Sequence, residues 1–274
     1  MSERDRYPAA VPCWVETLQP DPRAALDFYG PLFGWEFAGP GPMPGDPPGQ
    51  YFVARVKGRD VAGIGSRPSN TQAPEWTTYI RVDSVDETVA TATKAGGSLR
   101  HGPFDVLPAG RLAVLADPAG ARFGVWQAGA REGAQLVNEP QTWAMNVLHT
   151  TDPEPSNAFY GAVFGWQPQP FGPPEGRSAV LRLPDYVGGE PRQPVPRDVV
   201  AVVTRIPDGA SSTDAQPHWR VHFCVADADA SAAHAIRLGG AVIVPPHDTP
   251  GLRNCVLADP HGAVFSVSQV AGSP

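Results

Sequence analysis

An eight-residue stretch, FYGPLFGW at positions 28–35, returns as FYGAVFGW at positions 159–166. The two copies differ at only two positions and stand 131 residues apart in a chain of 274. This repeat constrains the fold more than any other feature of the sequence, because a duplicated segment indicates a duplicated structural unit. The octapeptide belongs either to an active site or to a scaffold, and the residues around it favour the scaffold.

Both copies of the octapeptide lie within a helix pattern. An acidic N-cap precedes a proline at the first helical position in each, Asp21-Pro22 and Asp152-Pro153. A glycine suited to a left-handed C-cap follows each phenylalanine, at Gly34 and Gly165. The sequence therefore predicts two equivalent helices whose aromatic residues pack on a sheet.

A second repeat lies further along each half. Residues 76–97 align with 219–240, and each segment predicts a strand followed by a capped helix that ends at paired glycines. Residues 112–127 align with 254–269, and each predicts two strands joined by a DPxG turn. Each half thus contains two βαβββ modules, which gives an α+β chain of four modules.

The polar stretch GAREGAQLVNEP separates the two halves. We expect a first domain over residues 1–130 and a second over 140–274. The second half is longer, and the surplus falls in the Pro- and Gly-rich stretch near 183–198, which we interpret as a loop insertion or lid.

Composition excludes several functional classes. A net charge of −7 and a pI near 5.4 argue against nucleic acid or an anionic membrane as partner. No apolar run reaches the roughly 20 residues of a membrane span, and the first residues carry no secretory signal pattern. The three cysteines, Cys13, Cys224 and Cys255, form no CxxC motif, so we expect a cytoplasmic protein without disulfides.

These motifs together resemble the glyoxalase, bleomycin-resistance and extradiol dioxygenase superfamily, known as the vicinal oxygen chelate fold. The resemblance is carried by FYxxxFGW in the first helix, W-x-x-[YH] before the second, GG after it and ADPxGAxF at the last hairpin. It covers nearly the whole chain and is nearest to the tandem two-domain actinobacterial members. It implies two cup-shaped sheets, each built from two modules. Its motifs specify the fold more than the function, because most of them are caps, turns and core.

The resemblance also implies where a metal would bind. Enzymes of this superfamily place His, Gln or Glu at fixed positions on the concave face of each cup. The six positions that align with confidence hold Trp14, Thr77 and Gly124 in the first domain, and Met145, Arg220 and Ser266 in the second. None of these is a usual ligand of a divalent metal, so we expect metal-free cups and no cofactor. Glu16 and His149 lie one strand period away and leave a displaced site open.

Strand parity identifies the side chains that would face each cup. The opposite parity carries apolar residues such as Phe123, Phe223 and Phe265, where helices must pack. We expect His218 on a loop and His261 at the surface. The predicted ligand-binding residues are Trp14, Glu16, Tyr79, Arg81, Arg122 and Trp126 in the first cup, and His149, Arg220, His222 and Ser266 in the second.

Two functions remain open from the sequence, and so does whether the protein is an enzyme. The first is metal-free binding of an aromatic small molecule, such as an antibiotic or polyketide, for sequestration or resistance. The second is a metal-independent isomerase, cyclase or hydrolase of natural-product metabolism that uses His149, His222 or Glu16 as acid and base. Four modules in one chain make a monomer feasible, and a homodimer is also compatible.

Overall fold

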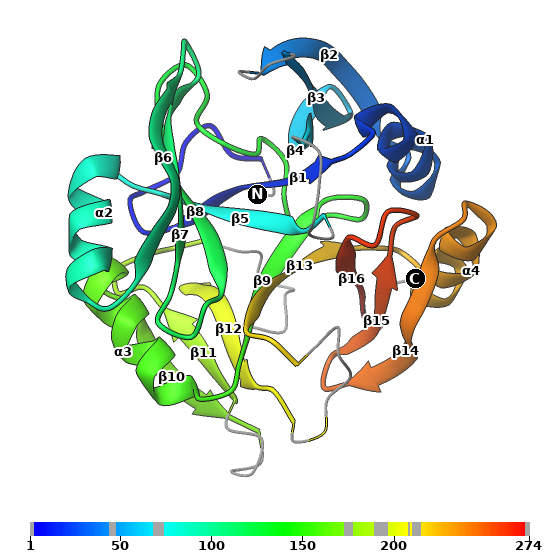
Figure 1. Cartoon of the computed structure of the whole chain (residues 1–274). Helices are drawn as coiled ribbons and strands as arrows, with labels where there is room; N and C mark the ends of the chain where they lie inside the picture. Colours follow the sequence, from blue (N-terminus) through cyan, green and yellow to red (C-terminus); the bar gives the residue numbers. More distant parts are fainter. Residues whose placement is uncertain are drawn as a thin grey trace.

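The computed structural model describes residues 3–43, 48–67, 74–172, 178–188, 197–207, 209 and 215–271. These residues form two curved sheets of eight strands each, with four helices between and beside them (Figure 1). The α+β fold of four βαβββ modules is confirmed. The Pro- and Gly-rich stretch joins two strands of the second sheet, and its residues 189–196 lie outside the described part of the chain.

The first sheet is built entirely from the first half of the chain. Its order is β2-β3-β4-β1-β5-β8-β7-β6, so the two modules meet where β1 and β5 pair antiparallel. Its elements are β1 (Pro12–Gln19), α1 (Pro22–Phe33), β2 (Glu36–Met43), β3 (Gly49–Val56), β4 (Arg59–Ser66), β5 (Trp76–Arg81), α2 (Val85–Lys94), β6 (Ser98–Val106), β7 (Gly110–Ala116) and β8 (Arg122–Ala128).

The second sheet repeats this arrangement, with the order β10-β11-β12-β9-β13-β16-β15-β14. Its two modules meet where β9 and β13 pair antiparallel. Its elements are β9 (Trp143–Thr150), α3 (Pro153–Phe164), β10 (Gln167–Phe171), β11 (Ser178–Arg182), β12 (Val199–Arg205), β13 (His218–Cys224), α4 (Ala228–Arg237), β14 (Ala241–Thr249), β15 (Leu252–Ala258) and β16 (Val264–Val270).

The two octapeptide helices begin and end as their caps predict. Asp21 Oδ1 accepts hydrogen bonds from the backbone N–H groups of Arg23 and Ala24, at 3.0 and 3.2 Å. Gly34 ends α1 with a φ of 66°, and Gly165 ends α3 with a φ of 73°. Only glycine adopts this left-handed conformation without strain, which explains the glycine at both positions.

The octapeptide aromatics pack on a sheet, as expected, and they contact the sheet of the other domain as well as their own. The Phe33 ring of α1 lies 5.0 Å from the Phe223 ring of β13, centroid to centroid. In the reciprocal contact, the Tyr160 ring of α3 lies 5.5 Å from the Phe123 ring of β8. Phe123 and Phe223 therefore lie on the helix-packing faces, as strand parity predicts.

Hydrogen bonds reinforce this exchange. The Tyr29 hydroxyl donates to Asp259 Oδ2 of the opposite DPxG turn at 2.9 Å and accepts from Trp76 Nε1 at 3.0 Å. The equivalent Tyr160 hydroxyl donates to Asp117 Oδ2 at 3.3 Å and accepts from Trp219 Nε1 at 2.8 Å. The repeated motifs thus form two matching clusters that join the domains.

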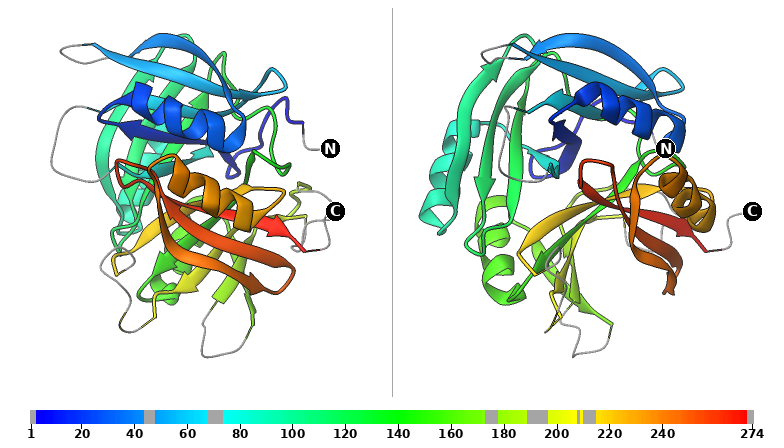
Figure 2. Two further views of the ribbon diagram at one scale, coloured as in Figure 1. Left: turned by 90° about the vertical axis from the view of Figure 1, so that its right-hand side faces the viewer. Right: turned by 45° about the vertical axis from the view of Figure 1, so that its right-hand side comes forward.

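The last residue of each octapeptide ties down the segment that leads into the other domain. Trp35 Nε1 donates to the backbone oxygen of Gln141 at 2.7 Å, and Trp166 Nε1 donates to that of Ala10 at 2.8 Å. Each acceptor lies two residues before the first strand of the opposite sheet. Helix α1 consequently lies beside α4, and α2 beside α3 (Figures 1 and 2). The octapeptide is scaffold, and its function is to join the two halves.

Candidate functional site

A buried carboxylate lies at the centre of the first cup. Glu16, on β1, accepts a hydrogen bond at each oxygen, from the Tyr79 hydroxyl and from the Tyr51 hydroxyl, both at 2.7 Å. Trp14 Nε1 donates in turn to the Tyr51 hydroxyl at 3.0 Å. Burial raises the pKa of Glu16 above its usual range, and the two tyrosine hydrogen bonds oppose part of that rise.

Aromatic side chains fill the first cup. Trp14, Tyr79 and Trp126 are all buried. The Tyr79 ring lies so close to β8 that a Cβ at Gly124 would clash with it, and a Cβ at Gly63 would clash with the Tyr51 hydroxyl. The predicted aromatic residues of this cup are therefore buried, and Tyr79 packs against the bare backbone of Gly124.

Tyr51 completes this cluster, and the sequence analysis missed it. It lies on β3, whose register against the other strands could not be aligned from the repeat. Its signal was the pair of glycines on β4, because Gly63 and Gly65 leave room for a large ring on the neighbouring strand.

The two predicted arginines of the first cup do not join the Glu16 cluster. Arg122 Nη1 lies 3.3 Å from Glu75 Oε1, where both side chains are exposed. Arg81 forms an ion pair with Asp83 at the end of β5 and faces a cavity beneath the N-terminal segment. In the described part of the chain, neither guanidinium forms a hydrogen bond or an ion pair with Glu16.

The second cup contains a stacked pair of imidazoles. The rings of His149, on β9, and His218, on β13, lie 4.7 Å apart and nearly parallel, because the two residues are directly opposite in the strand register. The expectation that His218 lies on a loop is wrong, since β13 begins at this residue. Arg220, only 5% exposed, lies with Nη2 2.8 Å from His218 Nε2.

A chain of hydrogen bonds fixes the protonation of His222. Thr249 donates to the backbone oxygen of Leu252, so it accepts from Asn254 Nδ2 at 2.6 Å. Asn254 Oδ1 then accepts from the Ser268 hydroxyl at 2.7 Å. The Ser268 oxygen must therefore accept from His222 Nδ1, 3.1 Å away, which leaves the Nε2 atom of His222 with a lone pair.

That lone pair has no hydrogen-bond partner within the described residues, although Nε2 is buried. Burial first, and then the charge of Arg220, lower the pKa of His222 to about 3. Burial, Arg220, His218 and His222 lower the pKa of His149 to about 2. Both imidazoles are therefore neutral at pH 7, and the buried Nε2 of His222 can only accept a hydrogen bond.

The residues at the expected metal-ligand positions do not fit a divalent metal in either cup. One of these positions in the second cup is Arg220, whose guanidinium has no lone pair to donate to a metal. At one position of the first cup, Gly124 presents no side chain. Ser266 lies opposite His222 in the strand register and is buried. Nowhere in the described ranges do three or more His, Cys, Asp or Glu side chains gather as a metal site.

The structure also defines the surroundings of His261 and Cys224. His261, expected at the surface, is half-buried, and its Nδ1 lies 3.2 Å from Gln19 Oε1 of the first domain. Cys224 is buried, and burial raises the pKa of its thiol to about 11, so it is not an activated nucleophile.

No helix in the described part of the chain is long and apolar enough to cross a membrane.

Family models match both halves of the chain. Residues 14–125 match the glyoxalase/bleomycin resistance protein/dioxygenase superfamily, and residues 144–268 match a glyoxalase-like domain. Among individual proteins, the chain is 39% identical to CFP32 of Mycobacterium tuberculosis, provisionally called a glyoxylase, over 99% of both chains. It is 35% identical to the anthracycline biosynthesis protein DnrV of Streptomyces peucetius, over 97% of this chain and 95% of that protein.

Solved structures show the same fold at lower identity. A Mn(II)-bound glyoxalase from Novosphingobium aromaticivorans superimposes with a TM-score of 0.63 at 17% identity, over 95% of this chain and 82% of that one. The 2,3-dioxygenase LapB from Pseudomonas sp. KL28 gives a TM-score of 0.60 at 14% identity, over 97% and 94%.

Proposed function

Because the chain belongs to the glyoxalase/bleomycin resistance protein/dioxygenase superfamily, we propose that it binds a hydroxylated aromatic small molecule, without a metal ion, in its second cup. The observation that carries this proposal is the buried, unpaired Nε2 of His222. An unsatisfied buried acceptor costs roughly 1–3 kcal/mol, and a ligand hydroxyl that donates to it would recover that energy.

The surroundings of His222 suit such a ligand. The stacked rings of His149 and His218 offer a flat surface for an aromatic ring, and Arg220 offers a cation to its π face or to an oxygen. A relative that shares 35% of its residues with this chain is named for anthracycline biosynthesis, which supports an aromatic natural product as the ligand class.

The first cup is the weaker candidate for binding. Trp14, Tyr79 and Trp126 were predicted to contact a ligand, but all three are buried within the folded chain. The Glu16 carboxylate has a tyrosine partner at each oxygen, so no polar group of this pair awaits a ligand. We propose that the first cup is structural.

The pKa shifts favour binding over acid–base catalysis. A general base works best with a pKa near the operating pH, yet the pKa of His222 is about 3 and that of His149 about 2. Glu16 is enclosed by its two tyrosines. The alternative, a metal-independent isomerase, cyclase or hydrolase, needs one of these groups to be poised near neutral pH in the complex.

We further propose a cytoplasmic location. The three cysteines, Cys13, Cys224 and Cys255, are free and buried, which suits a reducing compartment.

All four modules pack within one chain, so neither cup needs a second copy to complete it.

The proposal is tested by titrating the full chain with 1-hydroxyanthraquinone and with its 1-methoxy analogue, followed by ligand absorbance. We expect the hydroxy compound to bind the more tightly, and His222→Phe to weaken its binding by about tenfold or more, as the loss of one hydrogen bond requires. Tyr79→Phe is the matched control, because Tyr79 is the equivalent of His222 in the first cup. Equal binding of the two compounds, or an equal loss in both variants, would contradict the proposal.

A further inference from the structure

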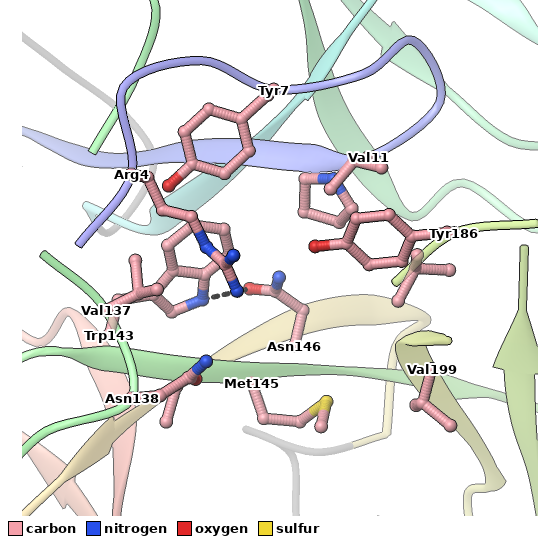
Figure 3. Close-up of a pocket in the computed structure, with 13 residues that line it drawn as sticks. Arg4, Tyr7, Val11, Val137, Asn138, Trp143, Met145, Asn146, Tyr186 and Val199 are labelled. Carbon is pink, nitrogen blue, oxygen red and sulfur yellow. Dashed lines mark hydrogen bonds between the residues drawn. The ribbon is translucent and has the colours of Figure 1, made fainter. Parts of the chain in front are cut away.

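A small cavity lies between the two domains, beside the second cup, with which it shares Met145. It encloses about 60 Å³ between the N-terminal segment, the start of β1, the strand β9 and Tyr186 (Figure 3). Its walls are mostly apolar and include Val11, Met145 and Val199. Polar side chains also line it, from Arg4, Tyr7, Asn138, Asn146 and Tyr186.

The amide of Asn146 is oriented by its surroundings. The side chain is only 1% exposed, and its Oδ1 accepts from Trp143 Nε1 at 3.1 Å and from the Thr78 hydroxyl at 2.8 Å. An indole N–H can only donate, so the oxygen must face Trp143 and the Nδ2 group must point the other way. Figure 3 shows this nitrogen directed into the cavity, and no described residue accepts a hydrogen bond from it.

Arg4 brings a positive charge to the same space. Its backbone N–H donates to the Gln135 oxygen at 2.9 Å, which holds the N-terminal segment against the first domain. Its guanidinium extends over the cavity toward Asn146 (Figure 3), and it has no ion-pair partner among the residues that the structure describes. An unpaired cation above a buried amide donor is an arrangement that recognises an anion.

Tyr186 and Tyr7 differ in what they offer. The Tyr7 hydroxyl already donates to the Ala134 backbone oxygen at 2.7 Å. The Tyr186 hydroxyl points into the cavity (Figure 3) and has no hydrogen-bond acceptor in the described ranges. Burial raises the pKa of Tyr186 while the Arg4 guanidinium opposes that rise, so the phenol stays protonated and can donate.

The cavity therefore presents one cation and two neutral donors within apolar walls. No acidic side chain among the described residues lines it. A single cation balances a single negative charge, and apolar walls make a doubly charged phosphate costly to desolvate. The volume holds about two waters, which suits the carboxylate head of an acid but not its remaining atoms.

A larger space of about 750 Å³ adjoins this cavity. It shares Arg4, Tyr7 and Tyr186 with the small cavity and adds Arg6, Arg81 and Asp185. A ligand whose head occupies the small cavity can therefore extend its remaining atoms into this space without crossing a cup.

We propose that this interdomain cavity binds the carboxylate of a small monocarboxylic acid, with Arg4, Asn146 and Tyr186 as its donors. The bound acid would join the N-terminal segment to β9 and to the segment that carries Tyr186, so it would also stabilise the contact between the domains. This site uses none of the predicted ligand-binding residues of the second cup, His149, Arg220, His222 and Ser266.

The test is titration of the full chain with sodium isobutyrate and with isobutyramide, its neutral analogue, followed by protein-observed NMR. An aliphatic probe avoids the aromatic preference that we propose for the second cup. We expect isobutyrate to bind with a dissociation constant near 1 mM or below, and the amide to bind at least about tenfold more weakly.

Variants locate the binding. Arg4→Gln should weaken isobutyrate at least about tenfold, and Tyr186→Phe about threefold. Asn146→Asp keeps an oxygen for Trp143 and Thr78 but puts a negative charge where the donor was, so it should abolish binding. Arg100→Gln, which removes an equal charge from an exposed side chain, and His222→Phe should leave binding unchanged.

Three results would overturn the inference. They are no binding up to about 10 mM isobutyrate, equal affinity for isobutyramide, and equal affinities in Arg4→Gln and Arg100→Gln. Loss of binding in His222→Phe alone would place the acid in the second cup and also contradict it. None of these results depends on whether the cup binds an aromatic molecule.

Discussion

Removing the hydroxyl of either octapeptide tyrosine should weaken the joint between the domains, and the two effects should differ. Tyr29→Phe breaks a 2.9 Å bond to Asp259 Oδ2 and leaves the buried indole N–H of Trp76 without its acceptor. Tyr160→Phe breaks a 3.3 Å contact with Asp117 Oδ2 and leaves Trp219 in the same state. The two substitutions are chemically identical, so each is the control for the other.

The distances set the expected magnitudes. A hydrogen bond to a charged group contributes about 1.5–3 kcal/mol, and an unsatisfied buried donor costs about 1–3 kcal/mol. The Tyr29 bond lies within the usual range for O–H···O, whereas the Tyr160 contact is longer than that range. We expect Tyr29→Phe to lower the free energy of unfolding by about 3 kcal/mol and Tyr160→Phe by about 1.5 kcal/mol.

Urea unfolding followed by circular dichroism measures both values, with the denaturant slope checked for constancy. Tyr186→Phe serves as a further control, because the Tyr186 hydroxyl has no hydrogen-bond partner among the described residues, so its loss should cost little. If Tyr160→Phe were as costly as Tyr29→Phe, or if both cost less than about 0.5 kcal/mol, the crossed hydrogen bonds would not stabilise the joint as argued.

Three further predictions concern the cups. Burial raises the pKa of Glu16 in the folded chain, so the folded state loses stability as pH rises above about 4.5. The free energy of unfolding of Glu16→Gln should therefore exceed that of the wild type at pH 7, and this difference should disappear near pH 4. A difference that stays constant with pH would contradict this. The pKa of His222 falls to about 3 on folding, so its contribution to stability is complete above about pH 6.5 and is lost progressively below that pH. A plot of unfolding free energy against pH should therefore be less steep below pH 6.5 in His222→Phe, by up to about 1.4 kcal/mol per pH unit. An unchanged slope would argue against a neutral, buried ring. Gly124→Ala should lower the melting temperature, because the added methyl group would clash with the Tyr79 ring. Overpacking of this kind costs about 1–3 kcal/mol. An unaltered melting curve would mean that the ring is free to move.

The local features of the fold could be predicted because the residues that specify them are close in sequence. Asp21 and Gly34 bound a helix through contacts within a few residues, so the cap pattern alone gave its ends. The apolar face with Phe223 and Phe265 followed from strand parity, which has a period of only two residues.

The partners of the octapeptide could not be predicted. Tyr29 and Asp259 are separated by 230 residues, and each had a sufficient local explanation, as a helix residue and as a turn residue. A single sequence shows that the two motifs repeat but not that each copy contacts the opposite domain. The position of His218 was missed for a different reason, because helix and strand boundaries are uncertain by a few residues and β13 starts at that residue.

The difference between the two cups follows from two exchanged residues. In the first cup, Glu16 accepts a hydrogen bond from Tyr79, so the polar end of the central ring has a partner. His222 takes the place of Tyr79 in the second cup, but the residue equivalent to Glu16 is Val147, which offers no polar atom. The imidazole is therefore held at Nδ1 by Ser268 and left without a partner at Nε2. The polar groups of Glu16 and Tyr79 thus hydrogen-bond to each other in the first domain, whereas the Nε2 atom of His222 in the second domain remains an acceptor without a donor. A ligand hydroxyl could supply that donor in the second cup.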